Sequence, residues 1–229
     1  MKGLEALALG GLSQSSLLIA GLAVYWVRPS TKVVGALAGF GAGALVAAVA
    51  FDLIPEAEGL KSWEVSIWLL VGALIFVVAD RVVESRFGEG DGSQPLGIVV
   101  GSVVDGVPES IIFGIQIAAG QMVSAAFLGA VFVSNLPQAL APSAELATQG
   151  WSRARMASMW GLVVGACAVT AWLGYVVGNL GVNGDRFAAI AAGGLLAMLT
   201  DSLMPYAMEK GGSFAGVWTV VGFAAALAM

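Results

Sequence analysis

The sequence has 229 residues, no histidine and a single cysteine, Cys167. Without imidazoles or paired thiolates, the chain cannot build the nitrogen- and sulfur-ligated sites that hold zinc in most zinc proteins. One cysteine also excludes a disulfide within the chain. Because Cys167 lies in an apolar run, we interpret it as a small buried apolar residue rather than a reactive thiol.

Charge is also scarce, because charged residues make up only 11% of the chain whereas hydrophobic residues make up 59%. Soluble domains carry about 25% charged residues, so this composition indicates an integral membrane protein whose partner is the lipid bilayer. The net charge of −5 and the lack of a basic patch argue against nucleic acid as a partner. No Gly-x-x-x-x-Gly-Lys-Ser/Thr segment is present, so we expect no ATP-binding machinery.

Most of the sequence consists of long apolar runs. A helix needs about 20 mostly apolar residues to cross a bilayer, and runs of this length alternate here with breaks rich in charges and turn formers. We therefore predict an all-α integral membrane protein, a bundle of eight transmembrane helices in a single domain, 1–229. The expected spans are 8–27, 34–57, 64–82, 95–119, 122–148, 155–178, 186–208 and 213–229. The first run also fits a signal peptide, but no clear small-residue cleavage site follows it.

Basic residues predict the orientation, since loops rich in Lys and Arg tend to stay in the cytoplasm. Connections after the first, third, fifth and seventh spans contain Arg28, Lys32, Arg81, Arg86, Arg153, Arg155 and Lys210. The opposite side contains only Lys2, Lys61 and Arg186. We therefore expect both termini outside the cytoplasm, the 81–94 connection inside it, and a location in the plasma (cell inner) membrane.

Four of the apolar runs contain a proline with a polar residue three positions before it and one position after it. Two residues four positions apart lie on one face of a helix, and each proline leaves the carbonyl four residues earlier without its helical donor. The four segments are 52–56 (D-L-I-P-E), 105–109 (D-G-V-P-E), 134–138 (S-N-L-P-Q) and 202–206 (S-L-M-P-Y). The freed carbonyls belong to Phe51, Val104, Val133 and Asp201.

Two carboxylates beside a freed carbonyl form a set of hard oxygen ligands. Carboxylates are costly in lipid unless a cation or a protein partner meets them, and kinked helices are tolerated where they line a polar cavity. This favours Asp105 and Glu109 as ligands of a divalent cation. For Asp52 and Glu56, near a helix end, an entrance role and a structural role both stay open. Asp201 is interpreted as a buried acid that either lines the pathway or holds a helix.

The same segments resemble the ZIP (Zrt-, Irt-like protein) family of divalent-metal transporters. Residues 105–110, D-G-V-P-E-S, are similar to that family's His-Asn-x-Pro-Glu-Gly helix, and 134–138 to its His-Glu-x-Pro-His helix. The runs that contain Pro55 and Pro205 resemble the other two proline-bearing helices. The resemblance covers essentially the whole chain and implies eight spans, external termini and a metal site between helices four and five.

That resemblance implies a specific set of metal ligands and pathway residues. The implied ligands are Asp105, Glu109, Ser134, Asn135 and Gln138, with Asp52, Glu56 and Asp201 along the pathway or at its entrance. The family site can hold two adjacent metals, but this chain lacks both imidazoles and the acid of helix five. Two cations side by side need several carboxylates to offset their repulsion, so we expect a single site. Oxygen ligands favour Mg, Mn, Ca or ferrous iron over zinc without excluding zinc.

The expected function is transport of a divalent cation (Zn, Mn, Fe or similar) toward the cytoplasm by alternating access. The metal is the transported substrate, and no cofactor is required. The alternative is a metal-binding or sensory membrane protein of ZIP-like architecture that has lost transport, as the altered helix-five motif suggests. An enzyme is not expected, because the chain has no histidine base and no nucleophile constellation at membrane depth.

Glycines recur at four-residue spacing in two of the runs. Gly35, Gly39 and Gly43 form one series, and Gly161 and Gly165 form another. Such faces let helices approach closely. They indicate packing within one bundle or, less often, the surface of a homodimer.

Overall fold

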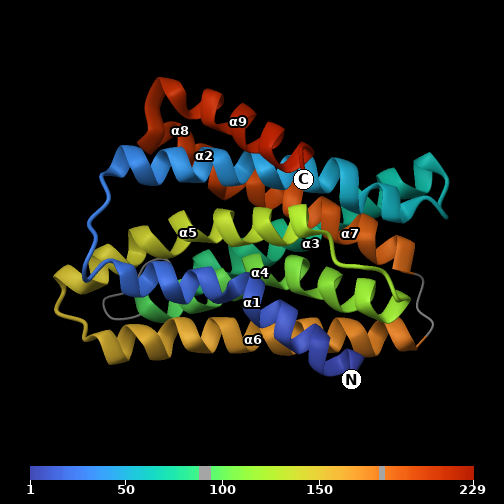
Figure 1. The fold of residues 1–229 in the computed structure, drawn as a ribbon, viewed down its shortest axis with the longest axis horizontal. Coiled ribbons are helices and arrows are strands. Elements are labelled where there is room, and N and C mark those ends of the chain that lie inside the picture. Colours follow the sequence, from blue (N-terminus) through green and yellow to red (C-terminus); the bar gives the residue numbers. More distant parts are fainter. Residues whose placement is uncertain (88–93, 181–183) are drawn as a thin grey trace.

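The computed structural model describes residues 1–87, 94–180 and 184–229, and within these ranges the regular structure is helical (Figure 1). The α-helices are α1 (Lys2–Ala23), α2 (Thr31–Ala48), α3 (Ser62–Phe87), α4 (Gln94–Ala119), α5 (Ala125–Thr148), α6 (Arg153–Asn179), α7 (Gly184–Met198), α8 (Met204–Gly211) and α9 (Ala215–Leu227). Seven helical segments in the described chain are long and apolar enough to cross a membrane. The all-α prediction is therefore confirmed for the described residues, which are compatible with a membrane bundle.

Local chemistry explains where several helices begin and end. Three begin after a serine whose hydroxyl accepts a hydrogen bond from the backbone N–H three residues later, which satisfies a donor that the helix leaves unpaired. These capping residues are Ser30, Ser124 and Ser152. Within the described ranges, three connections contain a glycine with positive φ, a backbone conformation that residues with a side chain rarely adopt. These are Gly120 at 76°, Gly150 at 86° and Gly212 at 64°.

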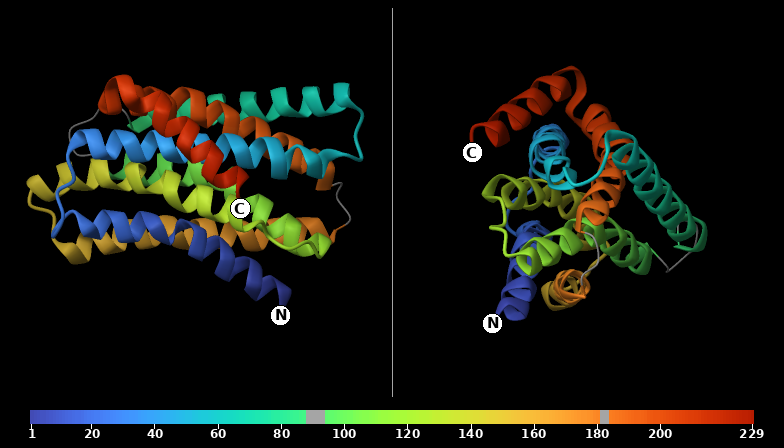
Figure 2. Two further views of the ribbon diagram at one scale, coloured as in Figure 1. Left: turned by 45° about the horizontal axis from the view of Figure 1, so that its top comes forward. Right: turned by 90° about the vertical axis from the view of Figure 1, so that its right-hand side faces the viewer.

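The helices run in alternating directions along the bundle, except that α8 continues the direction of α7, as Figures 1 and 2 show. The α1–α2 and α5–α6 connections and the α8–α9 turn lie at one end, whereas the α2–α3 and α4–α5 connections lie at the other. The first end also gathers aromatic rings under guanidinium groups: the Arg153 guanidinium carbon lies 4.5 Å from the Trp26 ring centroid, and that of Arg155 lies 3.8 Å from the Trp151 centroid. Rings and basic groups of this kind favour a membrane–water interface.

Two predicted boundaries differ from the structure. Helix α3 continues to Phe87, so the first part of the predicted 81–94 loop is helical, and residues 88–93 lie outside the described ranges. The predicted span 213–229 contains α9, which has only 13 residues. At about 1.5 Å per residue it is about 20 Å long, shorter than the roughly 30 Å hydrocarbon core. The described chain is nearly continuous helix from Gly184 to Leu227, and it reverses direction at Gly212 (Figure 1). The seven long apolar segments therefore include α7, α8 and α9 together as one.

Two helices widen into π turns immediately before their prolines. The turns span Val49–Leu53 and Leu199–Leu203, ahead of Pro55 and Pro205. In the first, the Ile54 N–H donates to the Val49 carbonyl at 3.0 Å, a bond that spans five residues. A proline ring cannot donate and clashes with the carbonyl four residues earlier, so the preceding turn widens.

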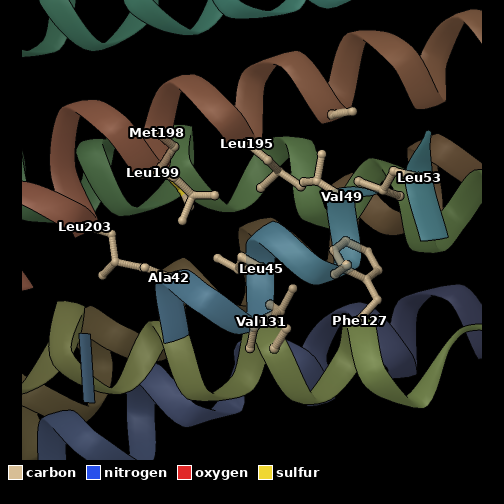
Figure 3. Close-up of a cluster of buried hydrophobic side chains, with 14 of the residues drawn as sticks. Ala42, Leu45, Val49, Leu53, Phe127, Val131, Leu195, Met198, Leu199 and Leu203 are labelled. Carbon is tan, nitrogen blue, oxygen red and sulfur yellow. The ribbon is translucent and has the colours of Figure 1, made fainter. Parts of the chain in front are cut away.

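The apolar core consists of two clusters that share α5. In Figure 3, side chains of α2 lie between those of α5 and those of α7, with Leu45 near Val131 and Val49 near Leu195. The second cluster joins α1, α5 and α6 and includes the fully buried Leu17, Leu146 and Trp160. The polar residues of α5 therefore lie between two apolar clusters.

The two glycine series have different surroundings. A Cβ atom at Gly39 would lie 3.0 Å from the Ala215 carbonyl oxygen, and Gly43 closely approaches the backbone of Thr219. Gly35, the first of the series, approaches the backbone of Gly211 at the end of α8, so the series packs α2 against α8 and α9 within one bundle, which is one of the two predicted roles. Gly161 and Gly165 have no neighbouring atoms within 4 Å of an added Cβ.

Candidate functional site

A glutamine on α1 links α4 to α5 at the centre of the bundle. Gln14 Nε2 donates to Glu109 Oε2 at 2.8 Å, and Asn135 Nδ2 donates to Gln14 Oε1 at 2.8 Å. The three residues are 0%, 1% and 2% exposed. Burying a carboxylate and two amides requires that they be hydrogen-bonded, and here they satisfy one another. We call Gln14, Glu109 and Asn135 the central network.

The sequence of α1 explains why Gln14 lies inside the bundle. Its neighbours Ser13 and Ser16 are also buried, and their hydroxyls donate to carbonyls of their own helix, Gly10 and Ser13. These residues are small and internally satisfied, so α1 can pack against α4, α5 and α6. Gln14 is not among the predicted site residues, because α1 has no proline motif. The available signal was the polar run 13–16, S-Q-S-S, within an apolar segment.

Gly106 leaves the space that the Gln14 amide occupies. A Cβ atom at Gly106 would lie 3.4 Å from Gln14 Nε2 and only 2.6 Å from Cys167 Sγ. An added Cβ would therefore press on Cys167 and touch the Gln14 amide at ordinary van der Waals distance. Cys167 is buried, as predicted. Its sulfur packs beside Gly106, which lies one turn before Ser110 on α4.

Asp105 and Gln138 line one cavity, of about 210 Å³, at the next level of the bundle. Ser202 and Tyr206 line it too, so three of the four proline segments meet there. A second cavity, of about 430 Å³, shares Tyr206 and Ala141 with the first and also includes Arg28 and Lys210 in its lining. The cavity at Asp105 therefore adjoins one that leads toward the basic end of the bundle.

Asp52 and Glu56 lie at the opposite level and are tied to other helices. Ser124 Oγ donates to Asp52 Oδ2 at 3.0 Å, and Gln116 Nε2 donates to Glu56 Oε1. Along α4, Gln116 lies about 10 Å beyond Glu109, and Asp105 lies about 6 Å before it, since a helix rises about 1.5 Å per residue. Polar groups therefore occur at three levels along the bundle.

Two predicted residues are placed differently from the rest. Ser134 Oγ donates to the Val131 carbonyl of its own helix at 2.9 Å, and its backbone packs on Gly41, where a Cβ would lie 2.6 Å from Ser134 Cα. Asp201 is exposed, so the prediction of a buried acid is wrong. Its neighbour Ser202 takes the inward position, because Ser202 lines the Asp105 cavity and the two residues are adjacent in a π turn.

The ligand chemistry of these levels is oxygen-based. Across residues 1–87, 94–180 and 184–229, no three Asp, Glu or Cys side chains gather closely enough to hold a metal ion. A cation would therefore meet one or two carboxylates together with amide and hydroxyl oxygens, a set that suits hard divalent ions.

Compared with known proteins, the sequence matches no protein-family model and no curated protein.

Proposed function

We propose that the protein carries a divalent metal cation across the membrane toward the cytoplasm, through the polar levels that α1, α2, α4, α5 and α8 surround. One observation carries the proposal. Glu109 is a buried carboxylate in a helix apolar enough to span a membrane, and it accepts a hydrogen bond from the neutral amide of Gln14. A buried acid without a cationic partner is unfavourable in lipid, and a passing cation supplies that partner.

The central network supplies the ligands. Glu109 contributes carboxylate oxygens, and Asn135 has a carbonyl oxygen in addition to the N–H group that it donates to Gln14. In this structure Gln14 points its N–H at Glu109 and its Oε1 at Asn135. When a cation binds beside Glu109, both amides turn, so that Gln14 offers Oε1 to the cation and donates its N–H to the Asn135 carbonyl oxygen. Such ligands favour Mn, Mg, Ca or ferrous iron over zinc, although a single site of this kind still binds zinc.

The proposed architecture is ZIP-like and has eight spans, of which α9 is one, with both termini outside the cytoplasm. The gathering of basic residues such as Arg28, Arg153, Arg155 and Lys210 at one end supports a cytoplasmic location for that end. Gly106 stands where the resemblance has asparagine, and the buried amide of Gln14 fills the adjoining space. In this proposal an amide from α1 replaces the amide that α4 lacks.

The path runs from Asp52 and Glu56, through the central network, to Asp105 and the adjoining cavities. Alternating access requires that one group of helices move against another. The proline-associated π turns of α2 and of the α7–α8 helix are the natural points of bending, since the regular hydrogen bonding is already interrupted there.

A second candidate function is a metal-binding or sensory protein without transport. The observation in its favour is that the central network is closed, with each of its three side chains nearly inaccessible and hydrogen-bonded to another. A cation can reside there without passing through.

Flux into proteoliposomes separates the two candidates. Uptake of Mn, Zn, Fe(II), Cd and Mg is measured for the intact protein, for Glu109→Gln and for Glu58→Gln, with matched insertion. Glu58 is exposed, so its variant controls for loss of one acid. Transport through the site predicts that Glu109→Gln loses the flux and Glu58→Gln keeps it. Metal binding by inserted protein without any flux would favour the second candidate.

A further inference from the structure

Near the end of α2, Asp52 and Glu56 are hydrogen-bonded to Ser124 and Gln116, and the side-chain oxygen of Gln116 is left without a donor. Gln116 is 1% exposed, and its Nε2 donates to Glu56. Its Oε1 is buried and has no hydrogen-bond partner. Because both atoms belong to one planar amide, the unused oxygen lies beside the Glu56 carboxylate.

A buried acceptor without a donor bears the full penalty of its lost hydration. If Gln116 served only to link α4 to Glu56 by a hydrogen bond, its amide nitrogen would be enough for that role. Burial of the amide oxygen would then bring no stabilising interaction. A cation satisfies an amide oxygen and a carboxylate together, as oxygen-rich sites for hard divalent ions do. The unpaired Gln116 oxygen therefore indicates that this residue is a cation ligand in addition to a hydrogen-bond donor to Glu56.

The position is open on the side of Asp52. Asp52 and Glu56 are half-buried, and a cavity of about 260 Å³ is lined by Asp52 and Ser124 together with apolar residues that include Phe51 and Met229. Mg²⁺ and similar ions usually retain several waters and bind through one or two carboxylates. Two half-buried acids, of which Asp52 lines the cavity, fit that mode of binding, with the buried Gln116 oxygen on the inner side.

Ser124 fixes the geometry of Asp52. Its hydroxyl accepts the Phe127 N–H at 3.2 Å as the cap of α5, and it donates to Asp52 Oδ2 at 3.0 Å. The second oxygen of Asp52 is not engaged by this bond. Ser124 is thus a positioning residue, because it orients a carboxylate while its own hydroxyl is committed to the helix cap.

We propose that Asp52, Glu56 and Gln116 form a second cation site, the α2-end site, which binds a partly hydrated hard divalent cation such as Mn²⁺. It lies about 10 Å along α4 from the central network, measured from Gln116 to Glu109. Its role as the first stop on the pathway rests on the proposed function. Its ability to bind a cation does not.

Mn²⁺ binding tests the site in the whole protein, held in nanodiscs and followed by the loss of the free-ion EPR signal. All variants carry Glu109→Gln, which removes the carboxylate of the central network. In that background Gln116→Leu is expected to weaken binding about tenfold. Gln116→Glu adds a third carboxylate and is expected to tighten binding by a similar factor, a gain that misfolding does not produce. Gln121→Leu, at an exposed amide five residues later, is the matched control and leaves binding unchanged.

Two results would overturn the α2-end site: no Mn²⁺ binding by the Glu109→Gln protein, or binding that is the same with Gln116→Leu and with Gln121→Leu. Either result leaves the proposed transport intact if the unmodified protein still moves a metal. Conversely, Gln116-dependent binding by a protein that moves no metal would support the α2-end site and refute the proposed function.

Discussion

Gln14 Nε2 lies 2.8 Å from Glu109 Oε2, although the two residues are 95 positions apart in the sequence. The amide is the donor that allows this carboxylate to be buried beside neutral groups. Asn135 completes the arrangement from α5. Helix α1 is therefore part of the candidate site, and the carboxylate and amide of α4 and α5 meet through it.

The first prediction concerns Gln14→Glu. Two facing carboxylates repel each other when the site is empty, so we expect a lower melting temperature in chelator than for the intact protein. A divalent cation removes that repulsion. At about one hundred times its Kd a ligand stabilises by about 2.7 kcal/mol, which corresponds to a rise of about 5–10 °C for a chain of this size. The variant should therefore show a larger Mn²⁺-dependent rise than the intact protein in thermal unfolding.

Gln14→Leu provides the comparison for that experiment. It has a similar volume but offers neither a donor nor a ligand, so the Mn²⁺-dependent rise should shrink. Equal rises in Gln14→Leu, Gln14→Glu and the intact protein would show that Gln14 is outside the cation site.

The second prediction concerns the space at Gly106. Because a Cβ atom there would lie 2.6 Å from Cys167 Sγ, Gly106→Ala should destabilise the protein by about 1–3 kcal/mol through overpacking. Cys167→Ala removes the sulfur and should recover much of that loss in the double variant. Unfolding measurements on the four proteins of this cycle give the coupling between the two positions.

Gly161→Ala is the matched control, since nothing lies within 4 Å of an added Cβ at that position. It should leave stability unchanged or raise it slightly, because alanine is the better helix former. If Gly106→Ala behaves like Gly161→Ala, the close contact with Cys167 does not constrain α4.

Periodicity and composition predicted the helices well because long apolar runs and their serine- or glycine-containing breaks are local features. The break at 28–32 shows this, since Ser30 within it caps α2, whereas Ser124, which caps α5, lies inside the predicted span 122–148. The proline alignment also marked Asp105 and Ser202, each three residues before a proline, and Gln138, one residue after a proline, and the structure brings these three to one cavity. A repeat at fixed spacing can be recognised in the sequence because it acts within single helices.

Residues whose roles depend on the packing between helices could not be predicted in this way. Gln14 and Gln116 look like ordinary amides in apolar runs until α1 and α2 are placed against α4. Asp201 and Ser202 differ by one position, and the π turn exposes the acid while the serine faces the cavity. Hydropathy cannot make that distinction, because widening a helix by one residue changes which side chain faces inward.

The third prediction concerns Asn135→Asp, which restores an acid on α5 beside Glu109. The added charge should tighten the binding of a divalent cation and slow its release, since conduction requires a site weak enough for the ion to leave. In proteoliposomes we therefore expect both the KM and the maximal rate of Mn²⁺ uptake to fall. The change also removes the Nδ2 donor to Gln14. A variant with raised KM would indicate that this lost hydrogen bond outweighs the added ligand.

The last prediction tests whether the Asp105 cavity is part of the pathway. Ser202→Leu places a larger apolar side chain in a cavity of about 210 Å³, which has room for it, so thermal stability should change little. Flux of the transported metal should fall strongly, because the cavity between Asp105 and Gln138 becomes narrower and less polar. Mn²⁺ binding at the central network should persist. Asp201→Asn, at the exposed neighbour, should keep its flux. If Asp201→Asn stops transport and Ser202→Leu does not, the ion follows the outer face of the π turn and the cavity is only a packing defect.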